Sequence, residues 1–239
     1  MPTKQPLLKR ILKFFGKLLL WFFILSIGSV LVLKFVPVYI TPLMIIRVIE
    51  QKMDGKPARL QHKWVPLEEI SQYLPQAVVA SEDNLFLQHS GFDWQQIKLA
   101  RQEAQKGRRV RGASTISQQT AKNVFLWQGK SFFRKGLEAY FTVLIETIWG
   151  KKRIMEVYLN SIEMGDGIYG AEKVAQLHFN KAAAKLTREE SAAIAATLPN
   201  PRRFNSAKPS PYIRKRKNQI LNLMNKIEKI DFRENKQKK

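Results

Sequence analysis

Glu82 and Asp83 are adjacent carboxylates in the stretch SEDNLFLQHSG at residues 81–91, and their residue type makes them candidates for acid–base chemistry. Pro75 suits the first turn of an expected helix that runs to about Asp83, which places both carboxylates at its C-terminal end. The negative end of the helix dipole disfavours ionisation there and raises a carboxyl pKa, as a general base requires. The alternative is a solvated acid pair at the surface end of a helix.

A second candidate is the polar stretch RGASTISQQTAKN at residues 111–123, in which hydroxyl and amide side chains surround Lys122. Hydroxyl and amide groups suit the hydroxyls of a sugar, and a lysine offers a point charge to a phosphate. Positive charges stand at and just before this stretch, on Lys106, Arg108, Arg109 and Arg111. The alternative is the N-terminal cap of a helix that follows a basic loop.

A third candidate is the sequence RKGLE at residues 134–138, which combines two cations with a carboxylate. At about 100° per residue, Arg134 and Glu138 lie together on the flank of an apolar stripe, beside Ile145. A charged pair at the edge of a buried face can line a cleft, and a surface salt bridge is the alternative. Glu146 is a weaker candidate near the same side of the helix.

Other patterns in the sequence exclude several kinds of site. The stretch GDGIYG at residues 165–170 follows YLN at residues 158–160 and suits a structural turn, because it lacks the Gly-Lys-Ser/Thr ending of a phosphate-binding loop. Without cysteine, the chain has no thiolate zinc site, disulfide or cysteine nucleophile. The S-x-x-K of a penicillin-binding transpeptidase and the G-x-S-x-G elbow are also missing. No metal-ligand spacing relates His62, His89 and His178.

Helices must position these side chains, because apolar residues recur at helical spacing and strand alternation is almost absent. The clearest helix is expected over residues 131–149, and Gly150 with the basic residues 151–153 suits its C-terminal end. A further helix is expected over residues 154–161.

The remaining elements are also expected to be helical apart from one connecting region. Thr187 with Glu190 three residues later forms a capping box, and Pro199 ends the helix that it starts. The strongly basic residues from Arg214 onward suit a final helix, and residues 43–70 suit a mixed connecting region. The predicted fold class is therefore mainly α.

The formal net charge of the 239-residue chain is +22, which suits nucleic acid, anionic lipid or a phosphorylated substrate. Residues 18–33 carry no charge, apolar character resumes after Lys34, and only basic charges precede this run. Its length and flank predict a retained membrane anchor over residues 18–40; a cleaved signal peptide and a core helix are the alternatives. The positive-inside rule places residues 1–17 in the cytoplasm and the later residues outside, which argues against nucleic acid as a partner.

Taken in their order, these segments resemble the motifs of the peptidoglycan glycosyltransferases of family 51. The pattern E-D-x-x-F-x-x-H-x-G at residues 82–91 resembles the first motif, and GASTISQQ at residues 112–119 resembles the G-G-S-T-I-T-Q-Q of the second. The R-K-x-x-E at residues 134–138 resembles the third motif, and residues 165–170 and 186–201 resemble the fourth and fifth.

This resemblance covers about residues 60–205. Ala113 and Ser117 stand where the family pattern has Gly and Thr, and both keep the size or the hydroxyl chemistry of the family residue. The anchor and the absence of a transpeptidase motif make the chain most similar to the single-domain members of the family.

The resemblance implies a lysozyme-like helical domain with a jaw against the membrane, and lipid II and a growing glycan chain as substrates. It implies that Glu82 deprotonates the acceptor hydroxyl, and that Glu138 assists the departing diphosphate directly or through water or a metal. The candidate cofactor is a divalent cation, Mg or Mn, at the diphosphate. The cations implied at the diphosphate are Lys122, Arg134 and Lys135. The residues implied at the sugar sites are Asp83, Phe86, His89, Ser114, Thr115, Gln118, Gln119 and Asn123.

The expected organisation combines the anchor with this domain in the bacterial inner membrane, with the domain on the outer side. Apolar residues at 125–127 and 132–133 suit a jaw that dips into the bilayer, and core packing is the alternative. A separate transpeptidase and division proteins are plausible partners. The expected segments are a basic cytoplasmic segment at 1–17, the anchor at 18–40, a connecting or jaw region at 41–60, the glycosyltransferase domain at 60–205, and a basic C-terminal helix and tail at 206–239.

The residues are also compatible with two other functions. A lytic, lysozyme-like muramidase would share a helical fold and an essential glutamate but would cleave the polymer. A basic membrane scaffold would use the charge only to attract anionic lipid. The basic pair beside Glu138 favours synthesis, because a diphosphate leaving group requires positive charge more than a strong acid.

Overall fold

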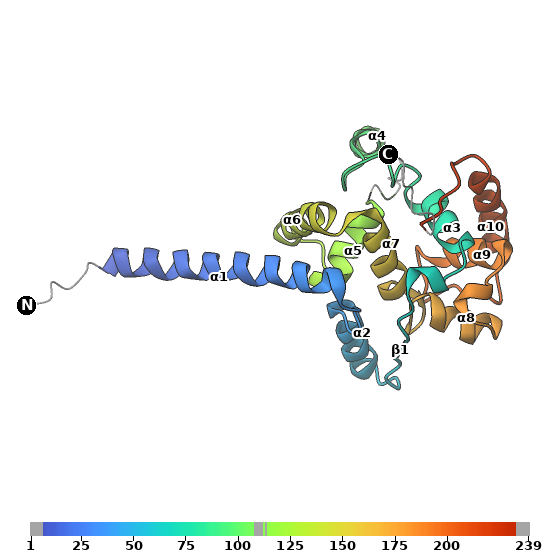
Figure 1. Cartoon of the computed structure of the whole chain (residues 1–239), viewed down its shortest axis with the longest axis horizontal. Helices are drawn as coiled ribbons and strands as arrows, with labels where there is room; N and C mark the ends of the chain where they lie inside the picture. Colours follow the sequence, from blue (N-terminus) through green and yellow to red (C-terminus); the bar gives the residue numbers. More distant parts are fainter. Residues whose placement is uncertain (1–6, 108–111, 113, 233–239) are drawn as a thin grey trace, which may run out of the picture. The chain divides into compact units, whose positions relative to one another are not determined.

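The computed structural model describes residues 7–107, 112 and 114–232 (Figure 1). The chain divides into two compact units, Met1–Val36 and Pro37–Lys239. Four positions singled out in the sequence lie outside the described residues, namely Arg108, Arg109, Arg111 and Ala113.

The first unit contains α1 (Leu7–Phe35), a helix of 29 residues that is long and apolar enough to cross a membrane by length and composition. At about 1.5 Å per residue, such a helix exceeds the roughly 30 Å hydrocarbon core of a bilayer. Basic residues from Lys9 onward, expected in the segment before the anchor, belong to this helix. The helix ends at Phe35, short of residue 40, because Pro37 restricts the residue before it and cannot donate a backbone hydrogen bond.

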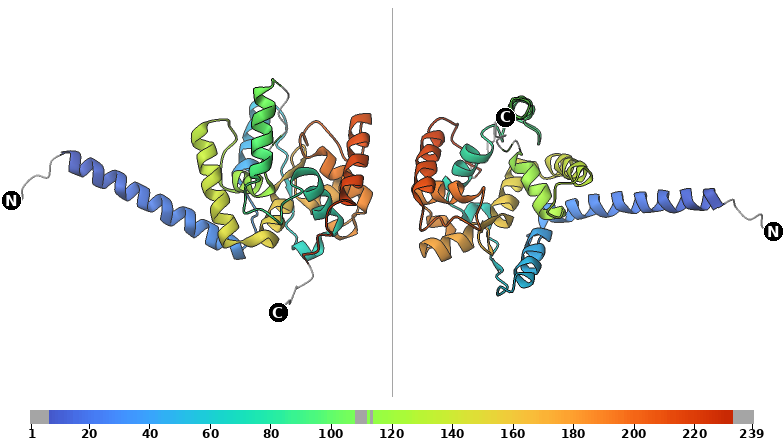
Figure 2. Two further views of the ribbon diagram at one scale, coloured as in Figure 1. Left: turned by 90° about the horizontal axis from the view of Figure 1, so that it is seen from above. Right: turned by 180° about the vertical axis from the view of Figure 1, so that it is seen from behind.

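The second unit is mainly helical, as the sequence predicts (Figures 1 and 2). Two short 3-10 turns, η1 and η2, join its α-helices. The bounds are α2 (Pro42–Met53), η1 (Leu67–Glu69), α3 (Tyr73–Glu82), α4 (Trp94–Gln105), α5 (Ile116–Phe125), α6 (Phe132–Ile148), α7 (Gly150–Ser161), α8 (Ala171–Phe179), η2 (Ala183–Lys185), α9 (Arg188–Thr197) and α10 (Pro211–Met224).

Two groups of helices form the core of this unit. α5 packs against α6 and α7, while α3 packs against α9 and α10. α10 runs beside α9 and α3 in both views of Figure 2. α7 is largely enclosed, with Met155, Tyr158 and Leu159 fully buried. Burying apolar side chains of this size contributes about 1.5–3 kcal/mol each, so α7 provides a rigid support for the helices around it.

A three-stranded sheet of very short strands was not expected from the sequence. The strand order is β1 (Gln61–His62), β3 (Ile168–Tyr169), β2 (Glu163–Gly165), with β1 parallel and β2 antiparallel to β3. The expected glycine turn is the connection between β2 and β3 and the entry to α8. Gly170 has φ 81°, and a Cβ there would lie 2.6 Å from the carbonyl oxygen of Asn160, so only glycine fits.

Helix starts follow the capping signals in the sequence. The predicted capping box of Thr187 and Glu190 is present at α9, and Ser131 caps α6. α6 ends at Ile148, and Gly150 follows its C-cap Trp149 with φ 73°, as expected of a glycine after a helix end. One boundary was wrong: α7 begins at Gly150 instead of residue 154, so the basic residues 151–153 belong to its first turn.

Three helices were not predicted individually: α4 and α8 lie in the part expected to be helical, and α2 lies mostly in the region expected to be a mixed connection. α2 carried a signal, since Thr41 accepts a hydrogen bond from the backbone of Met44 and Pro42 occupies the first turn. α4 has no buried residue among its twelve, so none of its apolar side chains belongs to the core.

Candidate active site

Glu82 is the last residue of α3, and its side chain is 15 % exposed. Ser81 Oγ donates a hydrogen bond to Glu82 Oε1 over 3.2 Å, and Gln119 Nε2 donates to Oε2 over 3.3 Å. The guanidinium of Arg216 on α10 approaches from another side, with Nη2 at 3.8 Å from Oε1. Residues distant in the sequence therefore enclose this carboxylate.

Burial raises the pKa of Glu82, because an enclosed carboxylate loses the hydration that stabilises its charge. The hydrogen bond from Gln119 and the charge of Arg216 oppose the rise, and the charge of Asp83 adds to it. The sequence attributes a raised pKa to the helix dipole, whereas in the structure burial is the main cause. A carboxylate of this kind is well suited to accept a proton.

Asp83 connects two helices of the site. Its Oδ2 accepts a 2.9 Å hydrogen bond from the backbone N–H of Ile116, the first residue of α5, and its Oδ1 lies 2.8 Å from His89 Nε2. The backbone N–H of Gly91 donates to His89 Nδ1 over 3.1 Å, so both ring nitrogens are engaged. Asp83 and His89 thus fix the C-terminal end of α3 to the start of α5.

Phe86 lies inside the protein and is fully buried. Lys151 Nζ is 4.5 Å from the centre of its ring and 2.6 Å from Glu146 Oε1. The same Glu146 oxygen accepts a short hydrogen bond from Ser117 Oγ. Phe86 therefore packs in the core, and Glu146, the weaker candidate, already has two donors.

The polar stretch begins α5, and its members divide into caps and site-facing residues. Thr115 and Gln118 form the capping box of α5, and Thr115 Oγ1 also donates to the carbonyl of Gly91 over 2.7 Å. Both side chains are buried, whereas Ser114 is exposed, and Asn123 is buried. Helix capping, the alternative considered for this stretch, accounts for Thr115 and Gln118.

Glu138 on α6 is a buried carboxylate between two cations. Arg134 Nη1 lies 2.6 Å from Glu138 Oε2, and Lys135 Nζ makes a short contact with Oε1. The pair is not a surface salt bridge, because the side chains of Arg134 and Glu138 are only 8 % and 4 % exposed. A buried carboxylate of this kind needs such partners, since an unpaired buried charge is costly.

Lys122 on α5 adds a third cation. Burial lowers the pKa of Lys122, the charge of Glu138 opposes this, and the charges of Arg134 and Lys135 lower it further. Arg47 of α2 also lowers it, although Arg47 forms its own ion pair with Glu163 at 3.3 Å. Positive charge therefore exceeds negative charge around Glu138, which suits a diphosphate.

α5 brings the two candidate carboxylates into one site. Gln119 bonds to Glu82, and Lys122, three residues later on α5, interacts with Glu138. Residues three apart share one face of a helix, so one face of α5 links the enclosed carboxylate to the cationic cluster. The predicted association of these segments is thus present in the fold, while the catalytic roles of their side chains stay predictions.

Two residues in contact with this site were not among the predicted ones. Tyr158 of α7 is fully buried, and its hydroxyl donates a hydrogen bond to Gln119 Oε1 over 3.3 Å. Arg216 stood within a basic run, yet it lies three residues after Ile213 and four before Ile220, both buried on α10. A charged residue on the apolar stripe of a helix is a usable signal of a buried partner.

The side chains around Glu138 do not provide suitable ligands for a divalent cation. Within the described residues, no group of three or more His, Asp or Glu side chains converges. Both oxygens of Glu138 already accept from Arg134 and Lys135, whereas Mg or Mn would require free carboxylate or carbonyl oxygens.

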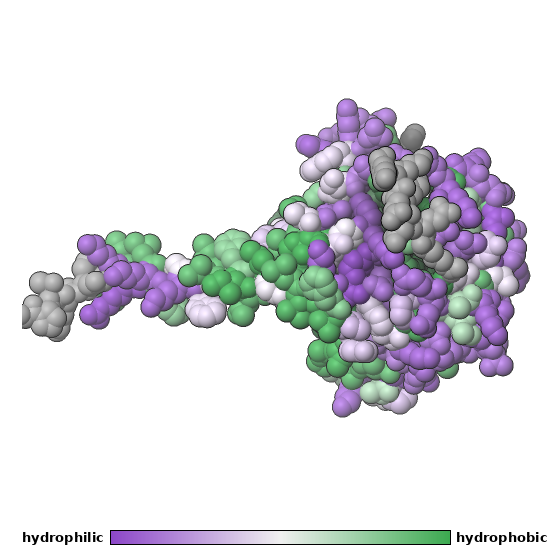
Figure 3. Space-filling model, viewed as in Figure 1, coloured by the Kyte–Doolittle hydropathy of each residue, from purple (hydrophilic) through white to green (hydrophobic). Residues whose placement is uncertain are grey.

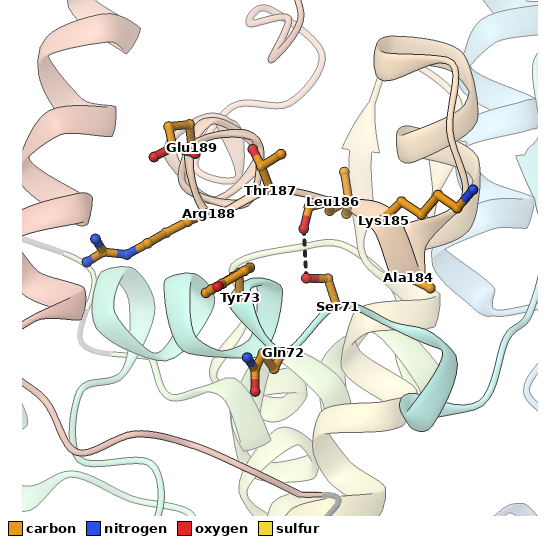
Figure 4. Close-up of a pocket in the computed structure, with 9 residues that line it drawn as sticks. All are labelled: Ser71, Gln72, Tyr73, Ala184, Lys185, Leu186, Thr187, Arg188 and Glu189. Atoms are coloured by element: carbon orange, nitrogen blue, oxygen red, sulfur yellow. Dashed lines mark hydrogen bonds between the residues drawn. The ribbon is translucent and has the colours of Figure 1, made fainter.

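A pocket of about 610 Å³ opens at the other end of α3 (Figure 4). Its walls are residues 71–73 and 184–189, and Ser71 Oγ donates to the carbonyl of Leu186 over 2.7 Å. None of the predicted site residues lines it. Since Glu82 ends α3 and this pocket lies at its start, the pocket is not the candidate active site.

Comparison with known proteins identifies the family. Residues 49–225, more than half of the chain, match the model of a family described as Transglycosylase. The chain belongs to this transglycosylase family. The predicted family, fold class and enzyme class are therefore confirmed.

Three relatives that carry the name biosynthetic peptidoglycan transglycosylase show the extent of the similarity. The relative from Bacteroides thetaiotaomicron is 57 % identical over 95 % of this chain and 92 % of its own length. The relative from Caulobacter vibrioides is 52 % identical over 85 % and 87 % of the two chains. The relative from Pseudomonas fluorescens is 47 % identical over 90 % of each. These names agree with the predicted resemblance to the single-domain members.

The transglycosylase match extends through α10. It therefore includes Arg216, which lies beyond the end of the predicted domain at residue 205. The expected segment boundaries stay predictions.

Proposed function

We propose that this chain is a peptidoglycan glycosyltransferase that polymerises lipid II, with Glu82 as the general base and Glu138 at the leaving diphosphate. The single observation that supports it best is the arrangement along α5. An enclosed carboxylate with a raised pKa bonds to Gln119, and one turn later Lys122 belongs to a cationic cluster around a second carboxylate.

The proposed reaction needs one base and one anion-binding cluster. Glu82 takes the proton of the acceptor 4-hydroxyl on the GlcNAc of lipid II, and the freed electron pair attacks the anomeric carbon of the donor MurNAc. The bond from that carbon to the diphosphate oxygen breaks, and undecaprenyl diphosphate of the growing chain leaves with the electron pair. Attack opposite the leaving group inverts the anomeric centre and forms a β-1,4 bond.

The cationic cluster stabilises the charge that develops on the diphosphate. Lys122, Arg134 and Lys135 supply the positive charge, and Glu138 holds two of them in place. The sugar-site roles of Ser114 and Asn123 belong to the same proposal. Thr115, Gln118, Asp83, Phe86 and His89 support it indirectly, because their contacts fix the helices that carry the base and the cluster.

The same cluster favours transfer over the lytic alternative. A glycosidase needs a carboxylic acid that protonates an alkoxide leaving group. Glu138 accepts hydrogen bonds from Arg134 and Lys135, so it is poorly placed to donate a proton. A diphosphate leaves without one, and positive charge is then the main requirement.

The exposed apolar side chains support a membrane location for the substrate. Phe132 and Phe133 are 98 % and 71 % exposed, and apolar side chains also cover much of α1 and gather over α2 in Figure 3. Of the predicted jaw residues, Leu126 is buried and Phe125 stacks on Phe141, with ring centres 4.5 Å apart. The single-pass inner-membrane topology, the growing glycan chain and a separate transpeptidase or division proteins as partners belong to this proposal.

The test is lipid II polymerisation by the purified full chain in detergent, with Glu82→Gln and Glu138→Gln alongside. A general base contributes about 10²- to 10⁴-fold, so we expect Glu82→Gln to lose at least 100-fold in rate while circular dichroism shows the native helix content. Equal rates of wild type and Glu82→Gln would rule out this base. Cleavage of glycan strands without polymer would support the muramidase reading, and neither activity would support a scaffold.

A further inference from the structure

Arg216 is a cation on the buried face of α10, directed at Glu82. Its Nη2 lies 3.8 Å from Glu82 Oε1, and the side chain is 29 % exposed. Its Nε is buried and has no hydrogen-bond partner within the described part of the chain. Burying an uncompensated cation is costly, so a guanidinium in this position is expected to compensate a nearby negative charge.

The position of Arg216 is set by the packing of α10. Ile213, Ile220 and Met224 are buried on α10, which packs against α9 and α3 (Figure 1). Gln76 of α3 reinforces this contact, since its Nε2 donates to the carbonyl of Met224 over 3.3 Å and its Oε1 accepts from the backbone of Ile230 over 2.7 Å. The helix that carries Glu82 and the helix that carries Arg216 are therefore joined rigidly.

The charge of Arg216 offsets an effect of burial that would otherwise hinder Glu82 as a base. A general base must be ionised to accept a proton, while burial favours its neutral form. Among the described residues, the groups that face Glu82 are the neighbouring Ser81 and Asp83, the uncharged Gln119 of α5, Tyr158 of α7 and Arg216 of α10. Asp83 is an acid and Tyr158 a buried phenol, so the compensating positive charge comes from α10.

We propose that Arg216 is a positioning residue of the reaction, which holds the carboxylate of Glu82 ionised and oriented inside its enclosed site. This inference rests on the proposed role of Glu82. It makes the C-terminal helix α10 a functional part of the site instead of a basic tail. Gln119, oriented by the hydroxyl of Tyr158, holds the other oxygen of the same carboxylate.

The acidic limb of the pH–rate profile tests this role. Removing a positive charge raises the pKa of Glu82 further, so the base is protonated up to a higher pH and activity is lost earlier as pH falls. An opposite charge at this distance shifts a carboxyl pKa by about 1–3 units, and partial exposure of Arg216 reduces that effect. We expect Arg216→Gln to move the acidic limb of kcat/KM upward by roughly one pH unit and to recover much of its rate at higher pH.

The experiment measures kcat and KM for lipid II against pH in wild type, Arg216→Gln and Arg216→Lys. The lysine variant keeps the charge and should shift the limb by less than the glutamine variant. Lys215→Gln is the matched control, because it removes one charge from an exposed neighbour on the same helix, and its limb should coincide with that of wild type. If Arg216→Gln does not fold, Arg216→Met replaces it, since it keeps an apolar stem in the buried stripe.

Three results would overturn the proposal. An equal loss of rate at every pH, with no shift of the limb, would indicate a purely structural role. A rise in KM with an unshifted limb would indicate that Arg216 contacts the substrate instead. A shift of the same size in Lys215→Gln would indicate a general effect of net charge. Polymerisation by Glu82→Gln at the wild-type rate would instead refute the proposed base itself, so the two failures are distinguishable.

Discussion

At the scale of single residues, burial and charge give the two carboxylates different properties. Glu82 is enclosed, and one guanidinium at 3.8 Å and two hydrogen-bond donors oppose the effect of burial on its pKa. Glu138 is buried between Arg134 and Lys135, which make direct contacts with both oxygens. One environment suits a group that must accept a proton, and the other suits a group that must hold cations in place.

Lys122 gives a prediction for the alkaline side of the pH profile. Because burial lowers the pKa of Lys122, its charge is lost at a lower pH than the charge of an ordinary lysine. We expect kcat to decline as pH rises through that pKa, and Lys122→Arg to move the decline to higher pH because arginine stays charged. Lys122→Met should lose about 10²- to 10³-fold in kcat.

The measurement is the rate of lipid II polymerisation from neutral to alkaline pH in the three proteins. If the alkaline decline occurs at the same pH in Lys122→Arg as in wild type, the decline reflects the titration of another group. A Lys122→Met variant as fast as wild type would remove Lys122 from the diphosphate site.

At the scale of elements, the connections between helices are as constrained as the helices. Asp83 joins α3 to α5 through the backbone of Ile116, and Gln76 joins α3 to the end of α10. Gly170 lets the β2–β3 connection pass directly against Asn160 before α8 starts. These connections fix α3 against α5 and α10, and the β2–β3 connection against the end of α7, so they support the helices that carry the site.

Gly170→Ala should destabilise the protein. Its φ of 81° is strained for any other residue, and the new Cβ would lie 2.6 Å from the carbonyl oxygen of Asn160, a backbone atom that cannot move aside. We expect a loss of at least about 2 kcal/mol in the free energy of unfolding. Urea unfolding of the detergent-solubilised protein measures it.

Gly136→Ala is the matched control for that experiment. Gly136 lies within α6, and nothing stands within 4 Å of a Cβ added there. Alanine favours a helix over glycine by about 0.5–1 kcal/mol, so this variant should be slightly more stable than wild type. Similar unfolding midpoints for the two variants would refute the steric account of Gly170.

At the scale of the whole molecule, the chain combines a long apolar helix with a separate compact unit that has its own core. Removal of residues 1–36 should therefore leave the midpoint of thermal unfolding of the remaining protein unchanged. We expect it to convert firm membrane anchoring into weak binding, which the basic charge and the exposed Phe132 and Phe133 maintain.

Flotation with anionic lipid vesicles measures this change. The full chain should float at low and high salt, whereas the shortened chain should float only at low salt, since salt screens attraction between exposed charges and lipid. Salt-resistant flotation of the shortened chain would show that the compact unit inserts by itself. Aggregation or a lower unfolding midpoint would show that α1 also stabilises the fold.

Much of the fold follows from local patterns in the sequence. The apolar run predicts α1, the capping box at Thr187 predicts the start of α9, and helical spacing predicts the contact between Arg134 and Glu138. These predictions succeed because each depends on residues within a single helix or at its cap. The helices α2, α4 and α8 were not predicted individually, although Thr41 and Pro42 mark the start of α2, and the strands are too short to show alternation.

The sequence by itself determined the family motifs, the mainly helical architecture and the identity of the candidate carboxylates. Only the tertiary structure decided what surrounds Glu82, because Gln119 and Arg216 reach it from two other helices and Tyr158 orients Gln119 from a third. It also replaced the helix dipole by burial as the main cause of the raised pKa of Glu82. The physical reason is that dehydration and long-range charge depend on how helices pack, whereas residue spacing determines only contacts within one helix.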